Sequence, residues 1–224
     1  KPVSTPRPAI ITTHLTNDPS CSMPWLIAFL VSSQTAYADV VTDMTAAASD
    51  AFARMPRVVL VDQIAGQCGA DGAVDPRVAY CTTGNQILVA ADTRDLPQTA
   101  YLLGHAFGHA VQVQHGVADI ALREIRKRPD EEVMLRGLVE RQVDCIAGYL
   151  VQRAGLPATD LAAVFQDDPL GRPHWGRDPL RVGPVVAVPI AARAEWFARG
   201  LAGNIGACSP GEFTGLGLIR ALKD

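Results

Sequence analysis

The feature that most constrains the fold of this chain is a pair of histidines, His105 and His109, in an apolar helical segment at residues 103–112. Residues four apart on an α-helix project from one face, about one turn from each other. Two imidazoles in that arrangement can reach a single tetrahedral zinc ion. They can equally form a satisfied pair inside a helical core, so the spacing alone leaves both interpretations open.

A second segment favours the metal. Glu140 and Asp144 are also four apart, in a helical pattern that runs from about residue 131 to 153. Both carboxylates therefore point the same way. One of them can coordinate a metal while the other accepts a histidine N–H and fixes its tautomer. The alternative is a solvated helix face, and the apolar residues 145–148 that follow argue against it.

Residue 106, directly after the first histidine, limits the hydrolytic chemistry of the site. In the motif His-Glu-x-x-His, the glutamate takes a proton from zinc-bound water. This chain has Ala106 at that position. Because a methyl group cannot accept a proton, the sequence predicts a site that binds metal and hydrolyses peptides poorly or not at all.

His115 is a rival third ligand, since it lies ten residues after His105. Proteases with that spacing need a glycine midway to break the helix, and this chain has Gln112 there. On an unbroken helix, ten residues leave His115 roughly 80° off the line of His105 and about 15 Å farther along. His115 and Gly116 therefore indicate a helix C-terminus with a left-handed glycine cap.

These segments resemble the neutral zinc metallopeptidases of bacteria. The resemblance rests on Gly-His-Ala-Phe-Gly-His-Ala-Val-Gln at 104–112 and Glu-Arg-Gln-Val-Asp-Cys-Ile-Ala-Gly at 140–148. Residues 80–88, residues 193–200, Cys208 and Phe213 also fit, so the match spans about residues 26–213. It implies a gluzincin-type zinc peptidase that acts on a peptide or protein. The metal ligands would be His105, His109 and Glu140, with Asp144 behind them.

The chain departs from the family pattern at two places. One is Ala106. The other is the segment 187–189, which is Ala-Val-Pro where the family often has His-Gly-Ser. His174 is a possible replacement, but a histidine between a proline and a tryptophan in a loop is more often exposed. We therefore leave His174 off the predicted ligand set.

Length and composition predict one compact domain. The resemblance implies that its fold is α+β, mostly helical and zincin-like, with a small β-sheet. The 224 residues are 48% hydrophobic, enough for a sizeable core. We expect residues 1–22 to be linker-like and residues 23–224 to form the domain. Residues 57–61 and 80–91 are predicted strands, with a turn at 83–85. Asp95 is the expected cap of the histidine helix, with Pro97 in its first turn. Residues 155–189 are expected to be an irregular excursion over the site or its rim.

The N-terminal part allows two interpretations. The apolar residues 23–31, followed by Ala-Tyr-Ala at 36–38, resemble a signal peptide. However, the run is too short to span a bilayer and lacks a basic flank. We interpret it as the first helix of the domain, continuing through Phe52. Residues 1–8 look like the stub of a linker from which an export signal or membrane anchor has been removed.

Charge and cysteines suggest the compartment. A net charge of −3 argues against a nucleic-acid partner. The basic run 123–128 is expected to form the solvated bend between the two metal-bearing helices, balanced by the acids at 130–132. Five cysteines suggest export to an oxidising compartment. The family resemblance implies the disulfide pairs Cys68–Cys81 and Cys145–Cys208. Cys21 could then be free, modified or an intermolecular partner.

The sequence therefore predicts a zinc-dependent peptidase that is inactive or nearly so because of Ala106. The alternative is a natural pseudo-peptidase that binds a peptide or protein without cleaving it. The retained ligands and Asp144 favour an engineered or recent loss of the base, because nothing physical maintains a costly buried carboxylate pair in an abandoned site.

Overall fold

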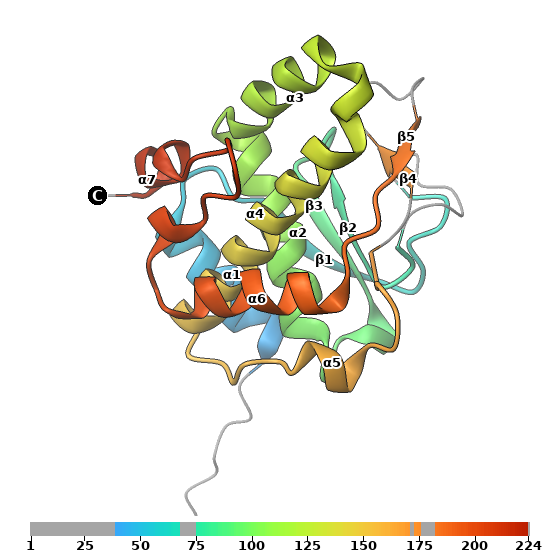
Figure 1. The fold of residues 1–224 in the computed structure, drawn as a ribbon. Coiled ribbons are helices and arrows are strands. Elements are labelled where there is room, and N and C mark those ends of the chain that lie inside the picture. The colour runs from blue at the N-terminus through green and yellow to red at the C-terminus, as the bar shows by residue number, and fades with distance from the viewer. Residues whose placement is uncertain (1–38, 68–74, 171–172, 176–181, 224) are drawn as a thin grey trace, which may run out of the picture. The chain divides into compact units, whose positions relative to one another are not determined.

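The computed structural model describes residues 39–67, 75–170, 173–175 and 182–223, with the backbone alone at 173–175 and 182–183. All of them belong to one compact unit, residues 37–224. The fold is α+β and mostly helical, as predicted (Figure 1). The helices are α1 (Val40–Ala51), α2 (Thr99–Gln114), α3 (Val117–Lys127), α4 (Glu132–Arg153), α5 (Leu161–Val164), α6 (Ile190–Leu201) and α7 (Leu216–Ala221). Single 3-10 turns are η1 (Ala91–Thr93), η2 (Pro129–Glu131) and η3 (Ile205–Ala207).

Helix α4 is the centre of the helical layer and packs between α2 and α6 (Figure 1). The approach to α6 depends on two glycines. A methyl group at Gly148 would sit 2.0 Å from the carbonyl oxygen of Phe197, and one at Gly200 would sit 1.9 Å from that of Cys145. On the other side, a methyl group at Gly108 of α2 would lie 2.8 Å from the side chain of Val143. The three helices are therefore closer together than larger residues would allow.

The sheet confirms the predicted strands. Strand β3 (Gln86–Ala90) lies between β1 (Arg57–Val61), which is parallel to it, and β2 (Val78–Cys81), which is antiparallel. The hairpin turn lies at the predicted residues, where Asn85 adopts a left-handed conformation with φ of 43°. Ile87 and Val89 are fully buried in the main core. Since β2 also contacts α2, the sheet supports the helix that carries the histidines.

The predicted start of α2 is wrong. The helix begins at Thr99, with Gln98 at the cap position, whereas Asp95 is 95% exposed. The chain forms η1 and a further turn before the helix, which places Asp95 too far from the first helical amides to cap them. The Thr99 hydroxyl instead donates to the Thr93 carbonyl. The other end is as expected: His115 is the C-cap, and Gly116 has a left-handed φ of 75°.

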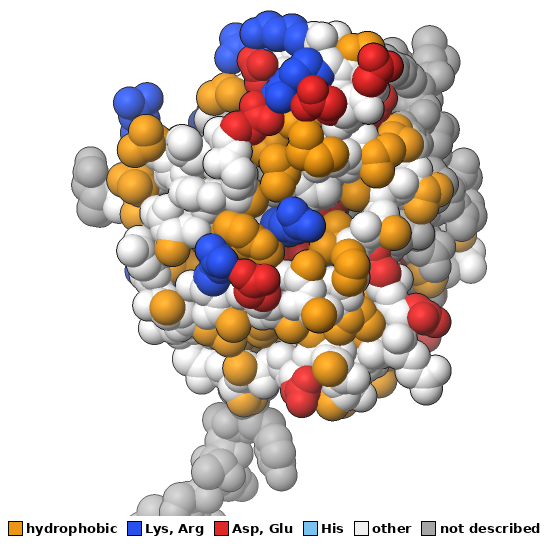
Figure 2. All heavy atoms as spheres, viewed as in Figure 1, with side chains coloured by type: hydrophobic (Ala, Val, Ile, Leu, Met, Phe, Trp, Pro, Cys, Tyr) orange, Lys and Arg blue, Asp and Glu red, His pale blue; other side chains and the backbone are white. Residues whose placement is uncertain are grey.

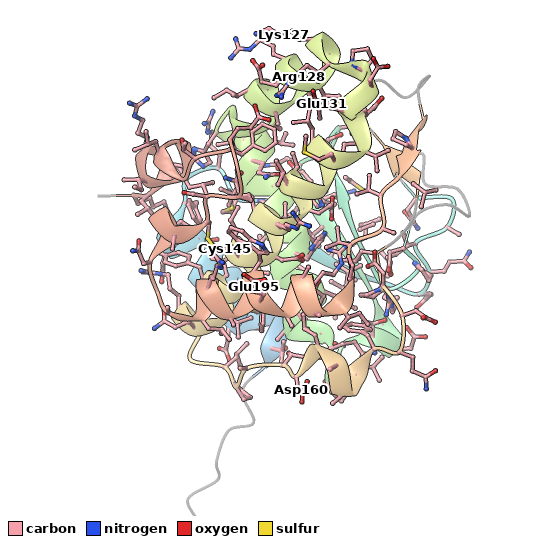
Figure 3. The ribbon with its side chains drawn as sticks, viewed as in Figure 1. Lys127, Arg128, Glu131, Cys145, Asp160 and Glu195 are labelled. Atoms are coloured by element: carbon pink, nitrogen blue, oxygen red, sulfur yellow. A yellow bond between two sulfur atoms is a disulfide. The ribbon has the colours of Figure 1, made fainter. Side chains whose placement is uncertain are left out.

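The basic run 123–128 is mostly helical, which corrects the predicted bend. It lies at the end of α3, because Val117, Ala121 and Ile125 recur at helical spacing and are buried. Charged side chains gather at this end of the molecule (Figures 2 and 3). Arg128 pairs with Glu131, as the sequence suggested, and also with Glu212 from the C-terminal segment. Helix α4 matches its predicted range of 131–153 to within one residue.

Helix α1 does not continue back through residue 39 as expected. It begins at Val40, where the extended residue Asp39 caps it by accepting from the Val41 amide at 3.2 Å. A helix running unbroken from residue 23 to Phe52 is therefore wrong. The predicted linker, the apolar run 23–31 and Cys21 lie outside the described residues. Within the described part of the chain, no helix has both the length and the apolar character needed to cross a membrane.

The described part of the segment 155–189 contains more regular structure than predicted. It contains α5 and a short antiparallel pair, β4 (Pro173–Trp175) and β5 (Val182–Val185). Helix α5 packs against α6, and β5 contacts α4. The described parts of this segment therefore lie against α4, which carries Glu140, and against its neighbour α6.

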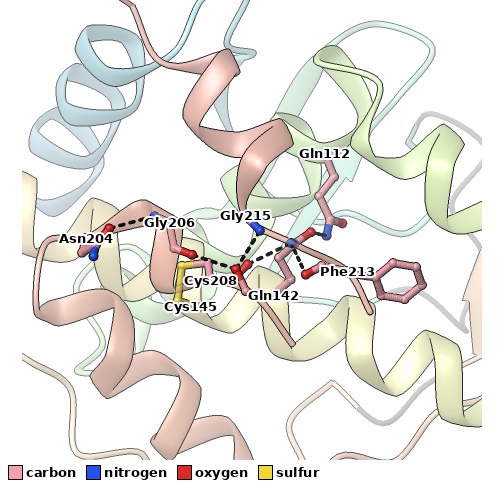
Figure 4. The surroundings of a disulfide bond; sticks show 9 residues. Gln112, Gln142, Cys145, Asn204, Gly206, Cys208, Phe213 and Gly215 are labelled. Carbon is pink, nitrogen blue, oxygen red and sulfur yellow. Dashed lines mark hydrogen bonds between the residues drawn. A yellow bond between two sulfur atoms is a disulfide. The ribbon is translucent and has the colours of Figure 1, made fainter. Parts of the chain in front are cut away.

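The Cys145–Cys208 disulfide is present, with its Cα atoms 5.4 Å apart (Figure 4). It attaches the C-terminal segment to α4. Gln142, on the same helix, reinforces this attachment: it donates to the Cys208 carbonyl at 2.9 Å and accepts from Gln112 of α2 at 3.0 Å. Cys81 is also disulfide-bonded. Its predicted partner, Cys68, lies outside the described residues, so that pairing stays a prediction.

The packing of α4 predicts opposite effects at two of its glycines. Gly148→Ala should lower the free energy of unfolding by more than about 2 kcal/mol, because the methyl group overlaps the backbone of α6. Gly137→Ala is the control, since nothing lies within 4 Å of the added methyl group. It should raise stability by about 0.5–1 kcal/mol through helix propensity. Urea unfolding measures both, and equal stabilities would contradict the close α4–α6 contact.

Candidate metal centre

Helices α2 and α4 bring the three predicted ligands together. His105 and His109 come from one face of α2, and Glu140 comes from the facing side of α4. Their potential ligand atoms all lie within 4.8 Å of one another. The two histidine Nε2 atoms are 3.1 Å apart. Glu140 Oε2 lies 3.4 Å from His105 Nε2, and Glu140 Oε1 lies 3.6 Å from His109 Nε2.

These separations suit one small metal ion. Ligand bonds of 2.0–2.2 Å in a tetrahedron place neighbouring donor atoms about 3.3–3.6 Å apart. Two imidazole nitrogens and one carboxylate oxygen are also a donor set that zinc accepts. Three protein ligands leave a fourth position for another molecule. His105 and Glu140 are buried, whereas the side chain of His109 is 25% exposed. The group can therefore hold a metal ion near the surface.

Asp144 lies behind His105, as the helix spacing suggested. Its carboxylate is fully buried, and its Oδ1 is 3.0 Å from His105 Nδ1. The Tyr101 hydroxyl donates to it at 2.8 Å and Arg193 Nη1 at 3.0 Å. With Nδ1 directed at Asp144, Nε2 of His105 faces the other ligands. A second partner of this kind fixes the ring orientation and makes the histidine a better ligand.

The charges around the site favour a divalent cation. Glu140, Asp144 and Asp168 contribute three carboxylates, and Arg193 contributes one guanidinium. With these groups ionised, this largely buried cluster has a formal charge of −2. Buried charges are costly unless they are paired. A dication held by His105, His109 and Glu140 would balance the cluster.

The same carboxylates raise the pKa values of the neighbouring basic side chains. Burial lowers the pKa of His105, but its hydrogen bonds to Asp144 and Glu140 more than offset this effect and raise the pKa to about 9. Burial also lowers the pKa of Arg193, but the neighbouring carboxylates outweigh it, so that the pKa lies above its ordinary value. Without a metal ion, His105 therefore binds a proton readily. A metal ion that binds at His105 would displace that proton.

Tyr101, Arg193 and Asp168 are site residues that we did not predict. The signal for Tyr101 was present, because it lies four residues before His105 on the same helix face. Arg193 lies in a segment that resembles the family, but only as a member of a helix. Asp168 follows α5 and had no motif around it. It is Arg193 that brings Asp168 to the site, with Nε donating to Asp168 at 2.8 Å.

Two candidate histidines are not part of the described cluster. His115 Nε2 lies 3.0 Å from the Ala53 carbonyl oxygen, at the far end of α2. This agrees with the prediction that it cannot share a metal ion with His105. The side chain of His174 lies outside the described part of the chain. The segment 187–189 does approach the site, since the Val188 amide donates to Asp168 at 2.9 Å.

Position 106 lies beside the ligands but offers only a methyl group. Ala106 is 5% exposed and belongs to the main hydrophobic cluster. The next residue, Phe107, is fully buried in the same cluster. The centre therefore combines ligands suited to a metal ion with an apolar side chain at the position of the motif glutamate.

Comparisons of the chain with protein-family models, with curated proteins and with solved structures found no match.

The geometry predicts about one zinc ion per chain, lost when a ligand is removed. His109→Ala should abolish stoichiometric binding, because two ligands hold zinc far less tightly than three. His115→Ala is the matched control: it removes a histidine from the same helix, but one that bonds to Ala53. Zinc is measured by elemental analysis after dialysis against the metal. Equal zinc contents in the two variants would contradict the ligand assignment, and a loss in His115→Ala alone would favour the rival ligand.

Proposed function

We propose that this protein is a zinc-binding domain of the gluzincin metallopeptidase type, in which peptide hydrolysis is absent or very weak because position 106 is alanine. The observation that carries the proposal is the proximity of His105, His109 and Glu140, whose potential ligand atoms, one from each residue, all lie within 4.8 Å of one another. Three ligands with an open fourth position are typical of catalytic rather than structural zinc sites.

Each group near the metal would have a separate role. A bound zinc ion would supply a Lewis acid that polarises a peptide carbonyl and water. His105, His109 and Glu140 would hold it, and Asp144 would keep the His105 ring in place. Ala106 has no atom that accepts a proton, so the water that attacks the peptide has no base at this position. The loss of a general base typically costs about 10²–10⁴-fold in rate.

The second candidate is a non-catalytic module that binds a peptide or protein at the same centre. The packing of Ala106 favours it: the side chain is 5% exposed among apolar neighbours, and a carboxylate there would be costly unless it reached the metal. The two functions share the metal site and differ only in whether the centre supports hydrolysis.

We further propose that the protein is exported. The Cys145–Cys208 disulfide supports this location, because disulfides persist mainly in oxidising compartments. The proposed partner is a peptide or protein, and the net charge of −3 gives no basis for nucleic-acid binding.

Restoring the carboxylate tests the choice between the two functions. Ala106→Glu should create peptide hydrolysis, because it returns a proton acceptor to the residue beside His105. Ala106→Gln is the matched control, with nearly the same size and no base, and should stay inactive. Cleavage of a broad peptide library by mass spectrometry is the measurement. The new activity should disappear with a chelator and return with zinc. A folded, zinc-loaded Ala106→Glu protein that cleaves nothing would favour the binding module.

A further inference from the structure

Arg193 joins two carboxylates that come from different parts of the chain. It lies on α6 and is 1% exposed. Its Nη1 atom donates to both oxygens of Asp144, at 3.0 and 3.2 Å. Its Nε atom donates to Asp168 at 2.8 Å. The same Nη1 atom lies 3.5 Å from the predicted ligand Glu140. One planar guanidinium therefore faces the centre on one edge and Asp168 on the other.

The backbone fixes Asp168 in turn. Its Oδ1 atom accepts from the amide of Leu170 at 3.0 Å, and its Oδ2 atom accepts from that of Val188 at 2.9 Å. Along the chain, Leu170 precedes β4 and Val188 follows β5. Carboxylates that accept several backbone hydrogen bonds are held in one orientation. Asp168 is therefore fixed by the backbone and in turn holds one edge of the Arg193 guanidinium, whose other edge contacts Asp144.

We propose that Arg193 is a positioning residue of the metal centre, an inference that rests on the proposed zinc site. Its guanidinium fixes Asp144, which orients His105 through Nδ1. The path from Asp168 to the ligand consists of three consecutive hydrogen-bonded contacts of 2.8–3.0 Å. Arginine suits this role because its rigid fork binds two carboxylates at once, whereas a lysine ammonium is a single point charge.

The charge of Arg193 and its positioning role predict opposite effects on zinc affinity when the residue is removed. A buried guanidinium repels a nearby dication, so its removal would tighten zinc binding if the ligands stayed in place. A positioning role predicts weaker binding, because Asp144 and His105 lose their fixed arrangement. The sign of the change in zinc affinity therefore separates the two effects.

The experiment compares two buried arginines. Arg193→Met removes the fork and keeps most of the stem. Arg136→Met is the matched control, because Arg136 is also buried, lies on α4, and pairs with Glu132 at 2.7–2.8 Å. Zinc affinity is measured by competition with a chelating dye. The Arg193 variant should bind zinc about 10–100-fold more weakly, and the control should stay within about twofold of the parent protein.

A second readout reports the geometry directly. The absorption spectrum of cobalt(II) depends on ligand arrangement, and it should change in the Arg193 variant and not in the control. A folded Arg193→Met protein with unchanged or tighter zinc binding and an unchanged cobalt spectrum would overturn the proposal.

If Arg193→Met does not fold, Arg193→Lys is judged by the same two measurements, since lysine keeps the charge but can contact only one of the carboxylates. If both variants fail to fold with zinc present, Arg193 is a structural residue and the proposal is wrong. Failure of the parent protein itself to bind zinc would instead contradict the proposed function.

Discussion

The hydrogen bonding of the buried Asp144 carboxylate is the interaction on which the rest of the structure depends. The carboxylate is fully buried, and it accepts hydrogen bonds from Tyr101 and Arg193 while lying 3.0 Å from His105 Nδ1. These donors come from α2 and α6, which lie on opposite sides of α4. An unpaired charge at this depth would cost several kcal/mol. The three helices must therefore meet around Asp144 in one arrangement, and that arrangement also places Glu140 one turn away, opposite the histidines.

This meeting is possible only because the helix contacts are lined with glycine. Gly148 and Gly200 allow the backbones of α4 and α6 to touch, and Gly108 admits Val143 on the other side. The Cys145–Cys208 disulfide begins at the residue after Asp144 and attaches the C-terminal segment at the same level. Close packing, a covalent link and a buried polar group thus coincide within a few residues of α4. The ligands are held by a rigid framework, which metal sites require.

The geometry separates metal binding from hydrolysis. The donor atoms and their charge balance depend on side chains at positions 105, 109 and 140 and on the residues behind them. Proton transfer depends on position 106, where the chain has a packed methyl group. Because position 106 is not one of the ligand positions, one function can be present without the other. This is the physical basis for our proposal of a zinc site with little or no peptidase activity.

The sequence by itself determined what depends on short-range spacing. The helical repeat placed His105 with His109 and Glu140 with Asp144, the turn residues 83–85 marked the hairpin, and Gly116 marked the end of α2. The pairing of Cys145 with Cys208 came from the family resemblance.

The tertiary structure decided what depends on contacts between distant segments. It alone brought Arg193 of α6 to Asp144 and Asp168 to Arg193, because nothing in the local pattern of residue 168 shows which part of the chain it will contact. It also decided that residues 117–127 form a helix and that Asp95 does not cap α2, since burial of the apolar face of α3 and the turn at η1 outweigh the charge and capping preferences of individual residues.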